Sequence, residues 1–140
     1  MTVTIDISDN IETCLAIRHT VFVEEQGIDL AEEIDGLDPE ATHVLATADG
    51  EAVGTARILF KNGDAKVGRV AVLPSHRGGG LGADIIRKTI AVARDTPGVT
   101  RVVLGAQTHA LGFYRQLGFQ SFGPIYDDAG IPHQDMELHL

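Results

Sequence analysis

Three consecutive glycines, Gly78 to Gly80, stand between Arg77 and an amphipathic segment in the stretch SHRGGGLGADII. Because glycine has no side chain, its backbone can come close to a bound group and can adopt left-handed conformations. The first amides of a helix have no partner inside the helix, and the helix dipole places about half a positive charge beside them. A strand, a glycine turn and a helix start in this order therefore predict a binding site for a phosphate or another anion.

Three phosphate-binding motifs share this outline, and the neighbouring residues distinguish them. A P-loop needs a lysine and then a serine or threonine after its glycines, and this stretch has no lysine at that place. A dinucleotide-binding fingerprint fits Gly78, Gly80 and Ala83, but it needs an acidic residue about twenty positions further on, at the end of the next strand. The stretch RVVLGAQ there contains no acid. The third pattern, Arg-x-x-Gly-x-Gly, is met in full by Arg77, Gly80 and Gly82.

Hydrophobic periodicity predicts the elements that would hold this site. Residues 81–95 form the clearest helix, since apolar residues fall on one half of the helical wheel and charged residues on the other. Asp9 and Glu12 resemble a capping box that begins an earlier helix, and Gly118 is typical of the end of a helix over 110–117. Strands are predicted over 2–7, 43–48, 52–60, 65–73, 101–105, 120–123 and 134–140, with tight turns at Asp49-Gly50 and Asn62-Gly63. This order predicts an α/β (α+β) fold around a central mixed sheet.

Length and composition restrict the class of protein. With 140 residues and 44% hydrophobic content, the chain predicts one domain over residues 1–140. It has no apolar run of about 18 residues and no signal-peptide pattern, so a soluble, cytoplasmic protein without membrane contact is expected. Cys14, the single cysteine, is expected to be a small buried residue, and no Cys/His spacing resembles a metal site. The net charge of −9 argues against nucleic-acid binding, which depends on neutralising phosphates.

The acidic residues are concentrated in the stretch EEQGIDLAEEIDGLDPE, residues 24–40. Such a run is typical of a solvated loop or helix face. The alternative is a rim that attracts a cationic amine, and the run by itself favours the solvated face. Arg18 falls on the apolar side of the first predicted helix, which favours a buried ion pair with an acidic neighbour.

The Arg-x-x-Gly-x-Gly pattern resembles the pyrophosphate-binding signature of the GNAT superfamily of acetyl-CoA-dependent N-acetyltransferases. RVAVLPSHRGGGLGADII is similar to the strand, loop and helix of that superfamily, and VVLGAQTHALGFYRQLGF to its following strand and helix. The stretches IRHTVFVEEQGI, EEIDGLDPEATHV and GIPHQDMEL further resemble the compact, bacterial ElaA-type branch. The resemblance covers nearly the full chain and implies a GNAT-like domain with a mixed, mostly antiparallel sheet flanked by helices.

The resemblance also implies acetyl-CoA as cosubstrate, without a metal, and direct acetyl transfer to a primary amine of a small molecule or peptide. The pyrophosphate would lie on the glycine turn, and one strand would pair its backbone with the pantetheine amides. The thioester would lie where residues 70–72 and 102–105 separate. The residues placed at the cofactor are Val70, Ala71, Val72, Arg77, Gly78, Gly79, Gly80, Leu81, Gly82 and Ala83.

Tyr114 matches the residue that acts as general acid in this family, and a phenol with a reference pKa of about 10 stays protonated at neutral pH. The alternative is an aromatic side chain packed beside Phe113. An alkylamine with a pKa near 10.4 is only about one part in a thousand neutral at pH 7, so a general base or a water relay is expected. The candidate bases and acceptor-side residues, taken from the segments that resemble the ElaA-type branch, are Glu33, Asp35, His43 and His133.

Two other functions compete with this hypothesis. A non-catalytic acyl-CoA-binding sensor would keep the glycine turn, and the presence of Tyr114 argues against it. A nucleotide-dependent oxidoreductase is disfavoured because the stretch RVVLGAQ has no acid. A homodimer is a form that many small GNAT proteins adopt, although no stretch of this sequence identifies a contact surface.

Overall fold

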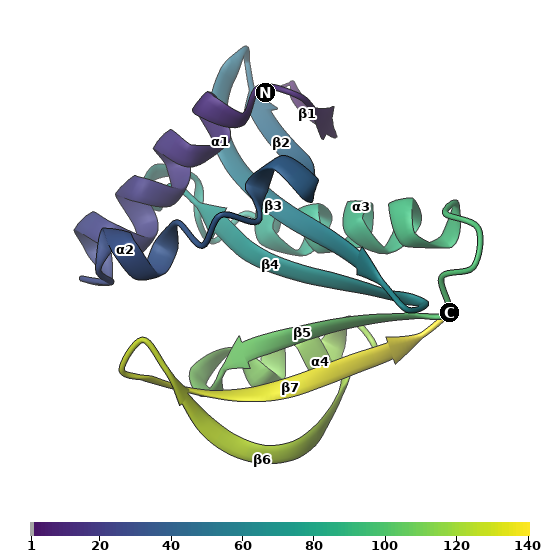
Figure 1. Cartoon of the computed structure of the whole chain (residues 1–140). Helices are drawn as coiled ribbons and strands as arrows, with labels where there is room; N and C mark the ends of the chain where they lie inside the picture. The colour runs from purple at the N-terminus through teal and green to yellow at the C-terminus, as the bar shows by residue number, and fades with distance from the viewer. Residues whose placement is uncertain (1) are drawn as a thin grey trace.

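The computed structural model describes residues 2–140, which fold around one seven-stranded sheet in the order β1-β2-β3-β4-β5-β7-β6 (Figure 1). The strands are β1 (Val3–Ser8), β2 (Thr42–Ala48), β3 (Glu51–Lys61), β4 (Asp64–Val72), β5 (Arg101–Gln107), β6 (Gln120–Asp128) and β7 (Ile131–His139). The α-helices are α1 (Ile11–Arg18), α2 (Leu30–Glu33), α3 (Leu81–Arg94) and α4 (Leu111–Gln116). A π-helical segment, η1 (His19–Glu25), continues α1, and short 3₁₀ turns form η2 (Asp38–Glu40), η3 (Pro74–His76) and η4 (Thr108–Ala110).

Neighbouring strands run antiparallel except β4 and β5, which are parallel. Helices α1 and α3 cover opposite faces of the sheet (Figure 1), and each buries its own apolar cluster. Val67 of β4 and Ile85 of α3 belong to the larger cluster, whereas Ile17 and Val21 meet Ala71 on the α1 side. The predicted mixed, mostly antiparallel sheet flanked by helices is therefore confirmed.

A β-bulge in β4 decides which of its residues face each helix. The register with β3 shifts by one residue at the bulge, where Arg69 has a left-handed φ of 52°. One extra residue inverts the alternation of side chains along a strand. Val67 faces the α3 cluster before the bulge, and Val70 and Val72 pack against the same cluster after it.

β4 and β5 are paired over a short length only. Their pairing runs from Asp64 with Arg101 to Lys66 with Val103. Beyond this point the two strands diverge (Figure 1), and each keeps only its outer neighbour, β3 for β4 and β7 for β5. The centre of the sheet is therefore open along half of both strands.

Most of the sequence-based element predictions are confirmed. Asp49-Gly50 and Asn62-Gly63 have positive φ at both residues, as a tight hairpin turn requires. Gly118, with a φ of 102°, follows the end of α4 in the expected left-handed conformation. Cys14 is fully buried. No helix within residues 2–140 is long and apolar enough to cross a membrane.

Two local predictions were wrong. The side chain that caps α1 belongs to Asn10 rather than Asp9, and it accepts a hydrogen bond from the Thr13 amide at 3.2 Å. The last two strands are also longer than the predicted 120–123 and 134–140, because β6 continues to Asp128 and β7 begins at Ile131. Pairing between these two strands satisfies the backbone there, which composition alone did not indicate.

Candidate active site

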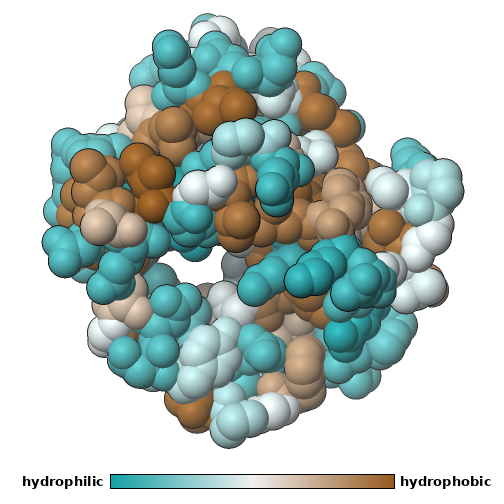
Figure 2. Space-filling model, viewed as in Figure 1, coloured by the Kyte–Doolittle hydropathy of each residue, from teal (hydrophilic) through white to brown (hydrophobic). Residues whose placement is uncertain are grey.

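The separation of β4 from β5 opens a cavity of about 550 Å³. Residues 67–70 of β4 form one wall, and residues 104–107 of β5 form the opposite wall. Tyr126 and His133 contribute from the β6–β7 hairpin, and Tyr114 from α4. Figure 2 shows the opening between the two halves of the molecule, with hydrophilic residues along much of its rim.

A second hollow of about 420 Å³ lies at the N-terminus of α3, beside the glycine turn. Gly78 and Gly80 have left-handed φ values of 87° and 84°, which a side chain would strain. Gly80 caps the helix without a side chain, and the Asp84 amide makes the first intrahelical bond to its carbonyl at 3.1 Å. Within residues 2–140, the amides of residues 81–83 therefore have no partner, and they remain available to an anion.

Arg77 lies beside this second hollow, but its guanidinium is already paired. Two of its nitrogens donate to the carboxylate oxygens of Glu25, at 2.5 and 2.6 Å, and its Nε donates to the Val72 carbonyl at 3.0 Å. These hydrogen bonds lower the pKa of Glu25 and raise that of Arg77. Glu25 therefore offsets the charge of Arg77, and the helix amides are the free donors at this hollow.

The edge of β4 that faces the open gap carries unused backbone groups. The Leu73 amide donates to the Val53 carbonyl at 2.9 Å, and Ala71 is paired with Thr55. The backbone amides and carbonyls of residues 71 and 73 therefore point toward β3. Hydrogen bonding alternates along an antiparallel strand, so residues 70 and 72 direct their amides and carbonyls away from β3. The Val72 carbonyl accepts from Arg77 Nε, and the other three groups face the gap. An extended molecule with amide groups would complete this edge.

Tyr114 both packs and lines the cavity. Its ring makes edge-to-face contacts with Phe113 and Phe119, at centroid distances of 5.0 and 5.8 Å. Burial raises the pKa of its phenol to about 12. The hydroxyl has no hydrogen-bond partner in the described chain, residues 2–140, so it remains free to donate into the cavity it lines.

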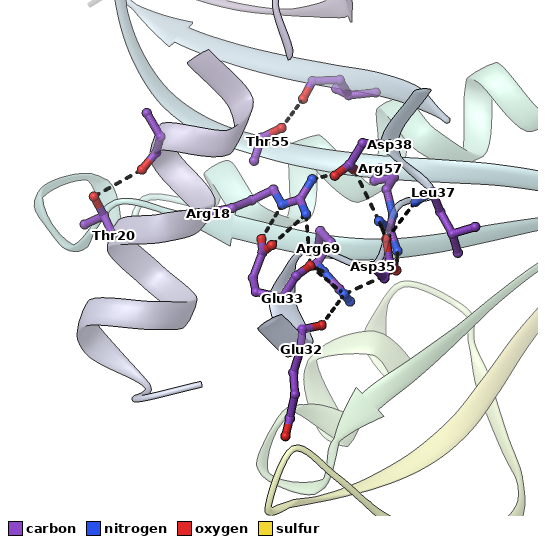
Figure 3. A network of polar contacts seen from close by, with 12 residues as sticks. Arg18, Thr20, Glu32, Glu33, Asp35, Leu37, Asp38, Thr55, Arg57 and Arg69 are labelled. Atoms are coloured by element: carbon purple, nitrogen blue, oxygen red, sulfur yellow. Dashed lines mark hydrogen bonds and ion pairs between the residues drawn. The ribbon is translucent and has the colours of Figure 1, made fainter. Parts of the chain in front are cut away.

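Five residues form an ionic cluster (Figure 3), and three of them, Glu33, Asp35 and Arg57, line the cavity. The members of the cluster are Arg18, Glu33, Asp35, Asp38 and Arg57. Arg18 donates to both carboxylate oxygens of Glu33, at 2.5 and 2.9 Å, and to Asp38 at 2.7 Å. Arg57 donates to both oxygens of Asp35, at 2.9 and 2.7 Å, and to Asp38 at 3.2 Å. The ionic cluster ties α1, β3 and the acidic segment to one another.

The prediction that residues 24–40 form a solvated face holds for six of the eight acidic residues there and is wrong for the other two. Glu33 and Asp38 are only 4% and 7% exposed. Buried carboxylates need close cationic donors, and arginines from α1 and β3 supply them. The buried ion pair expected for Arg18 is confirmed.

The ionic cluster makes Asp35 and Asp38 poor bases. Hydrogen bonds from Arg57 hold the pKa of Asp35 far below its usual range. Burial would raise the pKa of Asp38, but its bonds with Arg18 and Arg57 outweigh this effect and lower it. Because these folded-state values lie below the unfolded ones, the carboxylates stabilise the fold above about pH 4 and lose that contribution as the pH falls. Glu33 has both oxygens bonded to Arg18.

The two candidate histidines differ in access. His43 is 3% exposed, its Nε2 lies 3.0 Å from the Asp38 carbonyl, and its Nδ1 has no partner within residues 2–140. His133 lines the cavity, and its Nδ1 lies 2.7 Å from the Ile131 carbonyl. That contact assigns the proton of a neutral ring to Nδ1, so Nε2 keeps a lone pair that can accept a proton.

The sequence analysis missed the aromatic wall beside His133. Tyr126 stacks on that ring at 6.0 Å and donates to Asp135 at 2.7 Å. Burial and the bond to Asp135 raise the pKa of this second phenol. A Cβ at Gly105 would collide with the Tyr126 hydroxyl. A glycine inside an apolar strand often marks such a close approach, and Gly105 was the signal available in the sequence.

Comparisons with known proteins agree with this architecture. Residues 15–140 match the family model of the acetyltransferase (GNAT) domain. The uncharacterized N-acetyltransferase YjcF of Bacillus subtilis (strain 168) is 36% identical over 129 residues, which cover 91% of each chain. The crystal structure of Escherichia coli ElaA superposes with a TM-score of 0.85 at 30% identity, covering 97% of this chain and 99% of ElaA. A Bacillus subtilis acetyltransferase crystallised with CoA has the same fold, with a TM-score of 0.76 at 18% identity and 99% of each chain covered.

Glu33→Gln tests the stabilising role of the ionic cluster. The change leaves the buried guanidinium of Arg18 with one carboxylate fewer, and we expect the free energy of unfolding to fall by about 3 kcal/mol. Glu32→Gln is the matched control, because the neighbouring side chain is exposed and its loss should change stability by less than about 0.5 kcal/mol. Urea denaturation measures both, and equal midpoints for the two variants would contradict the assignment.

Proposed function

The chain belongs to the GNAT acetyltransferase family, and on this premise we propose that it moves the acetyl group of acetyl-CoA to a primary amine of a small molecule or peptide. One observation carries the proposal. The unpartnered amides at the start of α3 line the second hollow, and a protonated phenol on α4 lines the cavity between β4 and β5, with the end of β4 and the start of α4 contributing to both. The amides can hold an anion, and the phenol can donate a hydrogen bond.

The cofactor would lie along β4 and around the start of α3. The amides of residues 81–83 would receive the pyrophosphate, and the open edge at Val70 and Val72 would pair with the pantetheine amides. A Bacillus subtilis acetyltransferase of the same fold was crystallised in complex with CoA, which supports CoA as the ligand of this chain. The carboxylate of Glu25 would leave Arg77 or share it when a phosphate arrives, since both anions seek the same guanidinium.

The reaction forms a bond from the amine nitrogen to the acetyl carbon and breaks the bond from that carbon to sulfur. The acceptor's ammonium must lose one proton before its nitrogen can attack and a second proton as the amide forms, and the departing thiolate takes up a proton or accepts a hydrogen bond. A full transfer from a phenol of pKa about 12 to a thiolate whose acid has a pKa near 8.5 is uphill. Tyr114, the expected general acid, therefore acts chiefly as a hydrogen-bond donor that stabilises the charge developing on sulfur.

His133 is the base that the geometry favours among the four candidates. Glu33 and Asp35 are held by arginines, and His43 lies outside the cavity lining. His133 presents Nε2 while Nδ1 is anchored by the Ile131 carbonyl. It would take the proton that the ammonium releases, directly or through one water.

Titration with CoA, NAD and ATP tests the cofactor site, and Gly82→Val tests its geometry. We expect the native chain to bind CoA. The Gly82→Val variant should bind CoA about tenfold or more weakly, because the added side chain stands where the amides would meet the phosphate. A Cβ at Gly82 meets nothing closer than 3.7 Å, so the fold should tolerate it. Gly112→Val, at the same position of α4 and with open space around it, is the matched control. Tight NAD binding without CoA binding would contradict the proposal.

Tyr114→Phe should lower kcat about a hundredfold, the usual effect of removing one donor to a developing anion. The affinity for acetyl-CoA should stay within about twofold, because the ring and its packing remain. Thiol release at saturating substrate measures kcat, and calorimetry measures affinity. An unchanged kcat would remove Tyr114 from the mechanism, and no thiol release from the native chain with any amine would favour the sensor hypothesis.

His133→Gln should lower kcat/KM at neutral pH by about a hundredfold, the lower range for loss of a general base. In the native chain the base takes the proton of the ammonium, whereas the variant can react only with acceptor that is already a free amine. The kcat/KM of the variant should therefore rise toward the native value only at high pH, where the free amine is abundant. His139→Gln, on the exposed far end of β7, is the control. A pH profile of the same shape in both variants would exclude His133 as the base.

A further inference from the structure

Arg69 differs from Arg18 and Arg57 in how its charge is compensated. Each of those two arginines binds carboxylates at 2.9 Å or closer, and their side chains are 1% and 6% exposed. The Arg69 side chain is 25% exposed, and its nearest carboxylate oxygen belongs to Asp35 at 3.4 Å. That oxygen already lies 2.7 Å from Arg57. Arg69 therefore lines the cavity as an incompletely neutralised cation.

We infer that Arg69 binds a carboxylate of the acceptor, so that the enzyme selects molecules that carry both a primary amine and a carboxylate. The inference rests on the proposed acetyl transfer and specifies its substrate class. Arginine matches a carboxylate geometrically, because its planar fork can donate two parallel hydrogen bonds.

The donors of Arg69 leave room for such a ligand. Its Nε and one terminal nitrogen donate to the Glu33 carbonyl, at 3.3 and 3.0 Å, and the latter also reaches the Glu32 carbonyl at 3.4 Å. The other terminal nitrogen has no partner within residues 2–140. The backbone contacts hold the guanidinium in place while one side of it remains unused (Figure 3).

The backbone at Arg69 is a second, independent observation. A φ of 52° is uncommon for a large side chain, and it occurs at the bulge where β4 leaves β5. Strained positions of this kind persist where the surrounding structure requires a particular side-chain direction. Here the bulge places an arginine on the wall of the cavity, three residues beyond the last pair with β5, at Lys66.

The electrostatics of the wall agree with an anionic ligand. Burial and the neighbouring charge of Arg57 lower the pKa of Arg69, and the charges of Asp35 and Glu33 do not fully offset them. An anion beside the guanidinium would relieve both effects. A purely cationic polyamine would instead meet repulsion at this wall.

Another part of the cavity lining is acidic. Glu32 and Asp128 both line the cavity, and the Glu32 carboxylate points away from the arginines (Figure 3). An amino acid presents a carboxylate and an ammonium a few bonds apart. With its carboxylate on Arg69, its ammonium would lie toward the acidic lining, on the side of the cavity that His133 and Tyr114 line.

The test uses pairs of acceptors that differ only by a carboxylate: lysine with cadaverine, arginine with agmatine, and phenylalanine with phenethylamine. Thiol release from acetyl-CoA measures kcat and KM for each. We expect the best acceptor to carry the carboxylate and to exceed its partner in kcat/KM by about tenfold or more, because a site built for a charged group discriminates strongly against its absence. In the Arg69→Gln variant this preference should disappear because KM for the acceptor with the carboxylate rises. The kcat of the variant should stay within about twofold of the native value.

Two further variants separate recognition from folding. Arg69→Lys keeps the charge but not the fork and should retain part of the preference, whereas a structural defect would affect both members of a pair equally. Arg87→Gln removes one charge from an exposed pair on α3 and should keep the full preference. Equal or better activity with the decarboxylated amines would overturn the inference and leave acetyl transfer intact. No thiol release with any acceptor would contradict the proposed function itself.

Discussion

The parallel pairing of β4 with β5 ends at Lys66 and Val103, and this short contact controls the layout of the molecule. Backbone amides and carbonyls buried in a protein need partners, and a sheet normally provides them from strand to strand. Where β4 and β5 separate, each strand keeps only its outer neighbour, and its inner edge faces a cavity. The bulge at Arg69 lies just beyond this point, so the same local irregularity bends β4, inverts its side chains and places a cation on the wall.

The ionic cluster fixes the far wall of that cavity. Three carboxylates from the segment after η1 meet arginines of α1 and β3, so a stretch with little regular structure is held on the sheet. Breaking such an arrangement is costly because a buried charge would be left unpaired. This wall is therefore rigid and nearly neutral, and the groups that can still change partners, Arg69 and His133, stand where the cavity is lined from β4 and β7.

Local patterns in the sequence predicted the local structure well. The dipeptides at residues 49–50 and 62–63 need positive φ, and α3 has one apolar half, so both follow from neighbouring residues alone. Pairs between distant residues could not be predicted in this way. Glu25 and Arg77 are 52 positions apart, and Asp35 and Arg57 are 22 apart. The acidic run looked solvated because its cationic partners lie elsewhere in the chain.

These ion pairs between distant residues also explain how an acidic chain can offer sites to anions. The formal net charge is −9, yet three acids close to the two hollows, Glu25, Glu33 and Asp35, are bonded to arginines that offset their charge at short range. What remains locally is the dipole of α3 with its free amides, together with the incompletely matched charge of Arg69. Net charge acts over distances that salt screens, about 8 Å at physiological ionic strength, whereas these donors act in direct contact. Binding at the gap is therefore decided by which polar groups the fold leaves without a partner, and not by the sum of its charges.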